Sequence, residues 1–264
     1  MFAFLRDEWN ALRRAMRGLD AQTVTVLLTA TALALVQFTV GSRRLFREHL
    51  ADFFPEAVQG LLSWGWWFSI QGVTGFVIPV LILVFAFRQR PDEMGLGLGD
   101  WKLASVLALL YMPVVTLGTW VLSDQASFQT QYPHYHPAAF DWSTFWIYHA
   151  LFLFYWIGWE YLWRGYVLFG TARTFGVYAI LIQTMPFAIL HFRKPLPEAM
   201  LSIVGGVALG ALVWRCRSFW IAVPIHAYQM FILDFWCALR LRTEVHGIGP
   251  AALWELLTTW LQGS

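Results

Sequence analysis

The chain has 264 residues, of which 58% are hydrophobic and 13% are charged, with a formal net charge of +2. Soluble domains carry about a quarter charged residues, so this sequence has too few charges to cover a surface in water. The basic residues lie at the ends of long apolar runs, which gives no support for nucleic-acid binding. Composition therefore predicts an all-α, polytopic membrane protein surrounded by lipid.

The first twenty residues are expected to precede the membrane spans. The segment MFAFLRDEWNALRRAMRG contains four arginines and a weak amphipathic pattern. No small-residue cleavage site follows the apolar stretch behind it, so a signal peptide is not indicated. We expect residues 1–20 to be an uncleaved cytoplasmic leader.

Seven apolar stretches meet or approach the length of a membrane span. A hydrocarbon core about 30 Å thick requires about 20 helical residues. Four of the stretches contain a proline, which predicts kinks that neighbouring helices can accommodate. The approximate ranges are 22–41, 61–87, 103–122, 143–169, 175–191, 199–214 and 219–239. Because no linker or repeat separates them, we expect one membrane domain over residues 1–264.

The C-terminal stretch 250–261 is too short to cross a membrane and carries Glu255. It is predicted to be an interfacial helix with Trp254 and Trp260 at the level of the lipid headgroups, with a distorted eighth span as the alternative.

The loop 123–142 contains neither lysine nor arginine, so the positive-inside rule places it outside. We therefore expect an integral protein of a bacterial inner membrane with its N-terminus in the cytoplasm. Within this loop, His134 and His136 could bind a metal, although a turn-rich aromatic loop is the favoured interpretation.

Ionisable residues inside the spans are the main functional signal, because a charge at mid-bilayer costs at least about 2.5–3.5 kcal/mol. Glu160 and Arg164 are four residues apart in the fourth span, where they can form an ion pair. His191 closes the fifth span and His226 lies in the seventh. Glu160, His191 and His226 can converge around one water, and such an arrangement can catalyse hydrolysis or bind a metal. A purely structural ion pair and hydrogen-bonded core histidines remain the alternatives.

Other polar residues have less definite roles. Glu198 begins the sixth span, where its charge either suits a helix N-terminus or joins the polar site. Asp234 and His149 have no evident partner in the sequence and are expected to pack in the core or to support the site. Cys216 and Cys237 are too few for a disulfide framework and are interpreted as packing residues.

Three motifs between about residues 151 and 233 resemble those of the CPBP superfamily, the CAAX-protease and bacteriocin-processing group also called Abi. The family motif Glu-Glu-x-x-x-Arg is matched by WEYLWR, with Trp159 in place of the first Glu. Phe-x-x-x-His is matched by Phe187 and His191. His-x-x-x-Asn is matched at His226 only, because Met230 replaces the Asn. The segments WEYLWRG and KPLPE are similar to a variant subgroup of this family.

The resemblance implies an intramembrane peptidase that cuts near the C-terminus of a membrane-bound peptide or protein, with residues 143–239 as its catalytic core. In the family the first Glu of the pair is usually assigned as the general base. Because Trp159 replaces it here, Glu160 is expected to act as the base. Glu160 lies about 100° further round the helix, which makes this a variant site or a rotated helix. Arg164 would orient Glu160 and anchor a substrate carboxylate or oxyanion.

Two further roles are left open at the site. Because Met230 stands where the family motif has Asn, an amide donor is missing. Such a donor stabilises the transition state by about 2.7–4 kcal/mol where it has been tested. Arg164, Lys194 or Tyr228 could replace it. The cofactor is unknown, and a divalent metal such as zinc on His191 and His226 is an alternative to a metal-free water. From another class, a catalytically inactive scaffold that binds a helix or lipid is favoured by Trp159 and Met230. A transporter has little support, because no inverted pair of interrupted segments occurs.

Overall fold

The computed structural model describes residues 1–263, which form helices joined by turns and contain no strand. The α-helices are α1 Phe2–Met16, α2 Ala21–Thr39, α3 Arg43–His49, α4 Glu56–Gly72, α5 Ile78–Leu81, α6 Trp101–Ser123, α7 Ala126–Gln131, α8 Trp142–Glu160, α9 Leu168–Phe175, α10 Ala179–Ile189, α11 Leu196–Cys216, α12 Ala222–Thr243 and α13 Pro250–Gly263. Wider π-helical turns occur at η2 Val73–Val77, η3 Ile82–Ala86 and η5 Tyr161–Val167. Short 3₁₀ turns occur at η1 Ala51–Phe53, η4 His136–Ala139, η6 Gly176–Tyr178 and η7 Phe219–Ile221. The predicted all-α class is confirmed.

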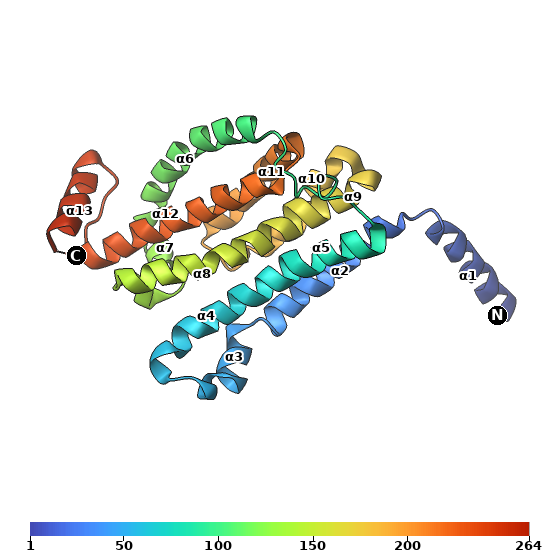
Figure 1. Ribbon diagram of the computed structural model, residues 1–264, viewed down its shortest axis with the longest axis horizontal. Helices are drawn as coiled ribbons and strands as arrows, with labels where there is room; N and C mark the ends of the chain where they lie inside the picture. The colour runs from blue at the N-terminus through green and yellow to red at the C-terminus, as the bar shows by residue number, and fades with distance from the viewer. Residues whose placement is uncertain (264) are drawn as a thin grey trace.

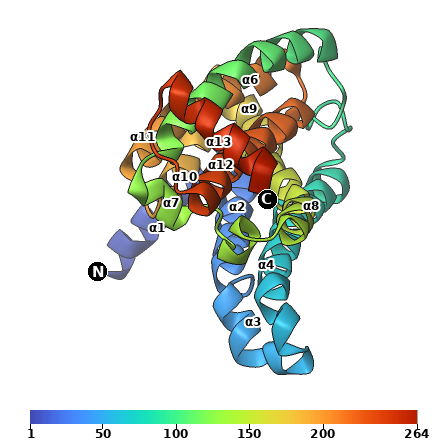
Figure 2. The same cartoon turned by 90° about the vertical axis from the view of Figure 1, so that its left-hand side faces the viewer.

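Six helical stretches of the described chain are long and apolar enough to cross a membrane. They are Ala21–Thr39, Glu56–Ala86, Trp101–Ser123, Trp142–Ile189, Leu196–Cys216 and Phe219–Thr243. Several of them lie side by side in one bundle, with α4 and α5 along α2 and α8, and α12 on the other side of α8 (Figures 1 and 2). The protein is therefore an integral membrane protein.

The 48-residue stretch Trp142–Ile189 contains two passes rather than one. The chain reverses at Gly176, whose φ of 53° is a conformation that glycine adopts readily. The returning helix α10 brings Phe187 to within 5.9 Å of Trp159, measured between ring centroids. This stretch thus supplies the fourth and fifth predicted spans, and the prediction of about seven spans agrees with the fold.

The returning helix α10 is short for a membrane span. Its 11 residues rise about 16 Å, roughly half of the hydrocarbon thickness. The segment containing α7 and η4 packs beyond the end of α10, with Phe128, Tyr132 and Ala138 fully buried. The loop between α6 and α8 is therefore part of the core, whereas the sequence favoured an ordinary turn-rich loop.

The two terminal helices lie at the periphery. Helix α1 projects away from the bundle, and α13 packs beside α12 (Figure 1). Helix α13 has 14 residues, and their rise of about 21 Å is too short for a span. Trp254 is exposed, while the Trp260 ring packs 6.0 Å from that of Trp142. This geometry agrees with the predicted short C-terminal helix and not with an eighth span.

Helix α8 crosses η2 in close backbone contact at two glycines. A Cβ atom on Gly75 would lie 2.2 Å from the carbonyl oxygen of Gly158, and one on Gly158 would lie 2.2 Å from the carbonyl oxygen of Gln71. Only glycine permits this approach, which brings α8 tightly against the second span just before Glu160.

Gly75→Ala is expected to lower the free energy of unfolding by about 1–3 kcal/mol, because the added methyl group overpacks this crossing. Gly118→Ala is the matched control, since a Cβ there meets nothing within 4 Å. Reversible unfolding in mixed micelles measures both variants. Equal stability of the two would contradict the close crossing.

Candidate active site

The centre of the bundle contains a buried group formed by Glu160, Arg164 and His226. Glu160 Oε1 accepts a hydrogen bond from Arg164 Nη1 at 3.1 Å and contacts His226 Nδ1 at 2.6 Å. Glu160 and Arg164 are fully buried, and His226 is almost so. The end of α8, the π-helical segment η5 and helix α12 thus bring together a carboxylate, a guanidinium and an imidazole, of which Glu160 and His226 are 66 residues apart in the chain. The predicted ion pair is formed.

The contact with Glu160 defines which ring nitrogen of His226 carries the proton. A carboxylate oxygen only accepts, so the proton between the two groups lies on Nδ1 in the neutral imidazole. His226 makes no other hydrogen bond within residues 1–263. Its Nε2 atom therefore keeps a lone pair. This carboxylate–imidazole arrangement is one that orients a histidine for proton transfer.

Several polar atoms of the group are without a hydrogen-bond partner in the described chain. They are Glu160 Oε2, Arg164 Nε and Arg164 Nη2. The guanidinium carbon of Arg164 lies 3.9 Å from the centroid of the Phe187 ring, which stabilises the cation by its π face. Buried groups of this kind are usually satisfied, so these unpartnered atoms make the group a candidate functional site.

The π-helical segment η5 begins directly after Glu160 and contains Arg164. Gly165 allows it, because a Cβ there would meet the Tyr161 ring at 2.2 Å. Single π-helical turns within α-helices occur frequently at functional sites. Within this widened turn, the Arg164 guanidinium donates a hydrogen bond to the Glu160 carboxylate.

His191 joins the same group from the turn after α10. Its Nδ1 atom donates to the Phe187 carbonyl oxygen at 2.7 Å, which leaves Nε2 as an acceptor in the neutral ring. The Phe187 ring lies 4.6 Å from the His191 ring and 6.0 Å from the His226 ring, between centroids. Glu160 and His226 thus meet, and His191 packs against the same phenyl ring as His226 without a hydrogen bond to either residue within residues 1–263.

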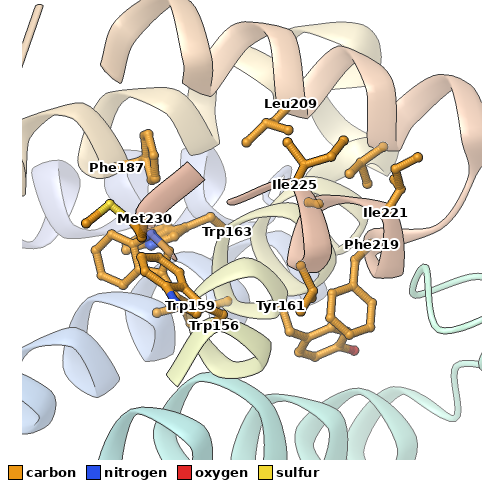
Figure 3. Packing of buried hydrophobic residues seen from close by; sticks show 14 of the residues in the cluster. Trp156, Trp159, Tyr161, Trp163, Phe187, Leu209, Phe219, Ile221, Ile225 and Met230 are labelled. Atoms are coloured by element: carbon orange, nitrogen blue, oxygen red, sulfur yellow. The ribbon is translucent and has the colours of Figure 1, made fainter. Parts of the chain in front are cut away.

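Trp159 and Met230, which replace two polar residues of the family motifs, are buried beside this group. Figure 3 shows Trp156, Trp159 and Met230 close together, with Phe187 above them. The Trp159 ring lies 6.3 Å from the His191 ring, whereas Glu160 contacts His226. Glu160 thus turns toward His226 on α12, while the ring of Trp159, which stands where the family motif has its first Glu, lies toward His191.

A second polar cluster lies around Lys194, in the turn between α10 and α11. Lys194 Nζ donates to the Tyr132 hydroxyl at 2.6 Å and to His134 Nε2 at 2.7 Å, and it lies 3.6 Å from Glu198 Oε1. The Tyr132 hydroxyl donates to Glu198 Oε2 at 2.5 Å. Glu198 thus belongs to a polar cluster, although not to the one around Glu160. Sequence reasoning missed Tyr132, because nothing in the YPHYHP segment indicated that it is buried.

Asp234 and His149 are partners, which the sequence did not reveal. His149 Nε2 lies 3.4 Å from Asp234 Oδ2, between α8 and α12. Asp234 lies two helical turns from His226 on α12 and within electrostatic reach of Lys194. Tyr228, by contrast, bonds Thr116 of α6 through their hydroxyl groups at 2.7 Å. It is therefore not brought to Glu160.

Burial and the charge of Lys194 lower the pKa of His134 well below its usual value. His134 donates Nδ1–H to the Gln131 carbonyl oxygen, so its neutral Nε2 accepts from Lys194. Arg43 and His136 also act to keep His134 uncharged. This neutral histidine ties the segment 126–139 to the α10–α11 turn.

Acidification is expected to loosen the segment 126–139. An opened His134 takes up a proton near pH 6.5, whereas the packed one does so only at lower pH, so the packed form loses stability as pH falls below about 6.5. Hydrogen exchange of these amides at about pH 7.5 and about pH 5, corrected for intrinsic rates, measures this. His134→Gln removes the pH dependence if His134 causes it, and an unchanged difference contradicts the assignment.

The structure offers few ligands for the predicted zinc site. Within residues 1–263, no three His, Cys, Asp or Glu side chains are grouped closely enough to hold a metal ion. His191 and His226 offer two Nε2 lone pairs, and a structural or catalytic zinc needs at least three protein ligands. The residues that the structure describes therefore do not fit a zinc site, and His134 and His136 provide none either.

Comparison with known proteins locates the family resemblance in the chain. Residues 141–232 match the family described as type II CAAX prenyl endopeptidase Rce1-like. No curated protein and no solved structure matches the chain. The matched range runs from the start of α8 into α12 and includes Glu160, Arg164, His191 and His226. The motifs and the match agree, and residues 141–232 are similar to the type II CAAX prenyl endopeptidases of the Rce1-like kind.

Proposed function

We propose that the protein is an intramembrane peptidase that hydrolyses a peptide bond near the C-terminus of a membrane-associated substrate. The observation that carries this proposal is the buried contact of 2.6 Å between Glu160 Oε1 and His226 Nδ1. Ionisable groups inside a membrane are energetically costly, and where they occur they usually serve a function. The match to a CAAX-type endopeptidase family supports the reaction class.

The geometry favours His226 as the general base, supported by Glu160. Glu160 Oε1 is occupied by His226 and Arg164, and Oε2, although without a partner in the described chain, belongs to a fully buried side chain. The His226 side chain is 8% exposed, and its Nε2 keeps a lone pair. In the first step, His226 Nε2 takes a proton from a water molecule whose oxygen bonds to the substrate carbonyl carbon. The Glu160 carboxylate stabilises the imidazolium that forms. This assignment differs from the expectation that Glu160 itself is the base.

Collapse of the tetrahedral intermediate completes the reaction. The carbon–nitrogen bond breaks, and His226 returns its proton to the leaving amine nitrogen. Arg164 Nε and Nη2 are donors without partners in the described chain, and they suit the negative oxygen of the intermediate. His191 Nε2 is an acceptor that can hold the second proton of the water.

A non-catalytic scaffold of the same fold is the second candidate, favoured by Trp159 and Met230. Both side chains are buried, at 5% and 4% exposed, and fill with apolar atoms two positions that are polar in the family motifs. Such a protein would bind a helix or lipid, and the polar group would serve stability only.

Cleavage by the purified full chain in lipid vesicles tests the two candidates. Membrane-associated peptides are incubated with the protein, and the products are identified by mass spectrometry. His226→Gln is expected to reduce the rate by about 10²–10⁴-fold, the usual contribution of a general base. His49→Gln is the matched control, because His49 is exposed. A peptidase with the same rate in both variants excludes the His226 role, and no cleavage by the wild type favours the scaffold.

A chelator added to the same assay decides whether a metal takes part. A metal-free water mechanism is expected to keep its rate after dialysis against the chelator. Loss of activity that zinc restores would require a third ligand, from the substrate or from a rearranged side chain.

A further inference from the structure

Helix α1 carries a stripe of large apolar side chains that the described chain leaves uncovered. Phe2, Leu5, Trp9, Leu12 and Met16 recur at intervals of three and four residues, so they lie along one face of the helix. Each of these five side chains is at least 50% exposed. Helix α1 also projects away from the bundle (Figure 1). We call these five residues the α1 stripe.

A helix of this length needs a surface to pack on. Helix α1 has 15 residues, and isolated helices shorter than about 12–15 residues are only marginally stable in water. Most helical stability in proteins comes from packing of an apolar face. Because the bundle does not cover the α1 stripe, the surface that stabilises α1 lies outside the chain.

Basic residues border one side of the α1 stripe. At 100° per residue, Arg6, Arg13 and Arg17 lie about 60–100° round the helix from the centre of the stripe. The guanidinium carbon of Arg13 lies 5.3 Å from the centroid of the Trp9 ring, so the cationic flank directly adjoins the apolar face. Residues 1–18 contain four arginines and two acidic residues, which gives a net charge of +2. Such a helix matches the boundary between acyl chains and anionic headgroups.

The connection to the first span keeps α1 near the membrane. Helix α1 ends at Met16, and the first candidate span begins at Ala21. The residues between them reach at most about 14 Å when fully extended. A short tether of this kind gives the membrane surface a high effective concentration at the helix.

The end of the bundle at which α2 begins also presents exposed cations. Gln22 of α2 accepts a hydrogen bond from Gln89 at 3.1 Å, and Gln89 lies between the exposed Arg88 and Arg90. Arg173 at the end of α9 contacts the residue that caps α2, and its side chain is 65% exposed. Basic residues close to a membrane surface attract anionic lipids. The charge of the adjoining bundle end thus favours the same partner as the charge of α1.

We propose that α1 lies flat on the bilayer surface and binds anionic phospholipids. The α1 stripe enters the boundary between headgroups and acyl chains, and Arg6, Arg13 and Arg17 contact lipid phosphates. A second copy of α1 fits the stripe less well, because the stripe covers only about two heptads, whereas coiled coils are recognised over three or four.

Hydrogen exchange of the full chain in lipid nanodiscs tests this proposal. One set of nanodiscs contains phosphatidylcholine alone, and the other also contains phosphatidylglycerol. The amides of residues 5–16 are expected to exchange at least about tenfold more slowly with phosphatidylglycerol, because each basic residue strengthens binding to an anionic surface about fivefold. High salt should reduce this difference, since it screens exposed charges. The amides of α12 should exchange equally in both lipids.

Two nearby charge changes separate the lipid contact from helix propensity. Arg6→Gln is expected to reduce the protection of α1 by about fivefold, whereas Glu8→Gln is expected to increase it. Arg, Glu and Gln have similar helix propensities, so only the sign of the lost charge differs. Trp9→Ser should reduce the protection in both lipids, because it removes a large side chain of the stripe. Phe53→Ser is the matched control, since it changes an aromatic residue that is 80% exposed elsewhere in the chain.

Equal exchange of α1 in the two lipids overturns the proposal. So does protection that persists in detergent micelles and rises with protein concentration, which would assign the stripe to a second copy. Equal effects of Arg6→Gln and Glu8→Gln would exclude the contact with lipid phosphates. None of these measurements depends on peptide cleavage, so failure of the lipid contact leaves the proposed peptidase function intact.

Discussion

Glu160→Gln is expected to lower the rate of peptide cleavage by about 10²–10⁴-fold, with little change in peptide affinity. The amide can still accept a hydrogen bond from His226, but it carries no charge to stabilise the imidazolium formed when water is deprotonated. The loss should therefore appear in kcat rather than in KM. Peptide hydrolysis in vesicles, at several substrate concentrations, separates the two constants.

The control for this experiment must show that the fold survives. Glu255→Gln makes the same chemical change at an exposed position of α13 and should keep full activity. The near-ultraviolet circular dichroism of Glu160→Gln should match that of the wild type, because the two side chains have nearly the same volume. An active Glu160→Gln protein would mean that the contact with His226 serves stability alone.

Arg164→Met is expected to lower the free energy of unfolding by about 3–5 kcal/mol, the cost of leaving one buried charge without its partner. Glu160 is fully buried, and within residues 1–263 Arg164 is its only cationic hydrogen-bond partner apart from a protonated His226. Unfolding in mixed micelles measures the difference. Arg173→Met is the control, because its ion pair with Asp20 is long, at 3.9 Å, and the Arg173 side chain is 65% exposed. Such a pair contributes at most about 1 kcal/mol.

The double variant Glu160→Gln, Arg164→Met distinguishes a charge effect from a packing effect. If the uncompensated carboxylate causes the loss of stability, removing its charge should restore part of the stability. If the double variant is as unstable as the sum of the two single variants, the Arg164 side chain matters through its packing on Phe187 instead.

The variant motif bears on which residue would act as the base in the proposed reaction. Trp159 faces His191 across 6.3 Å, and no carboxylate stands at that position. The remaining carboxylate, Glu160, has His226 as its neighbour on α12, one helical turn before Met230. A carboxylate–imidazole pair can still activate water through the imidazole. The substitutions at both family positions are thus compatible with one another, because each leaves the Glu160–His226 pair untouched.

The sequence by itself determined the membrane class, predicted about seven passes, and singled out the ionisable residues of the central group. These features depend on local quantities: the length of an apolar run, the cost of a charge in lipid and a spacing of four residues on a helix. Glu160, Arg164, His191 and His226 stood out because a charged or titratable residue inside an apolar run is rare. The matched range 141–232 also agrees with the motifs.

Only the tertiary structure decided how these residues are paired. Whether Glu160 contacts His191 or His226 depends on how α8, α10 and α12 pack, which hydropathy does not encode. Tyr132 and Lys194 are 62 residues apart, and they meet because the short helix α10 leaves room for the segment 126–139 to fill. Asp234 and His149 approach each other because α8 and α12 pack side by side. Contacts between distant segments depend on side-chain packing and helix length together, so no single stretch of the sequence specifies them.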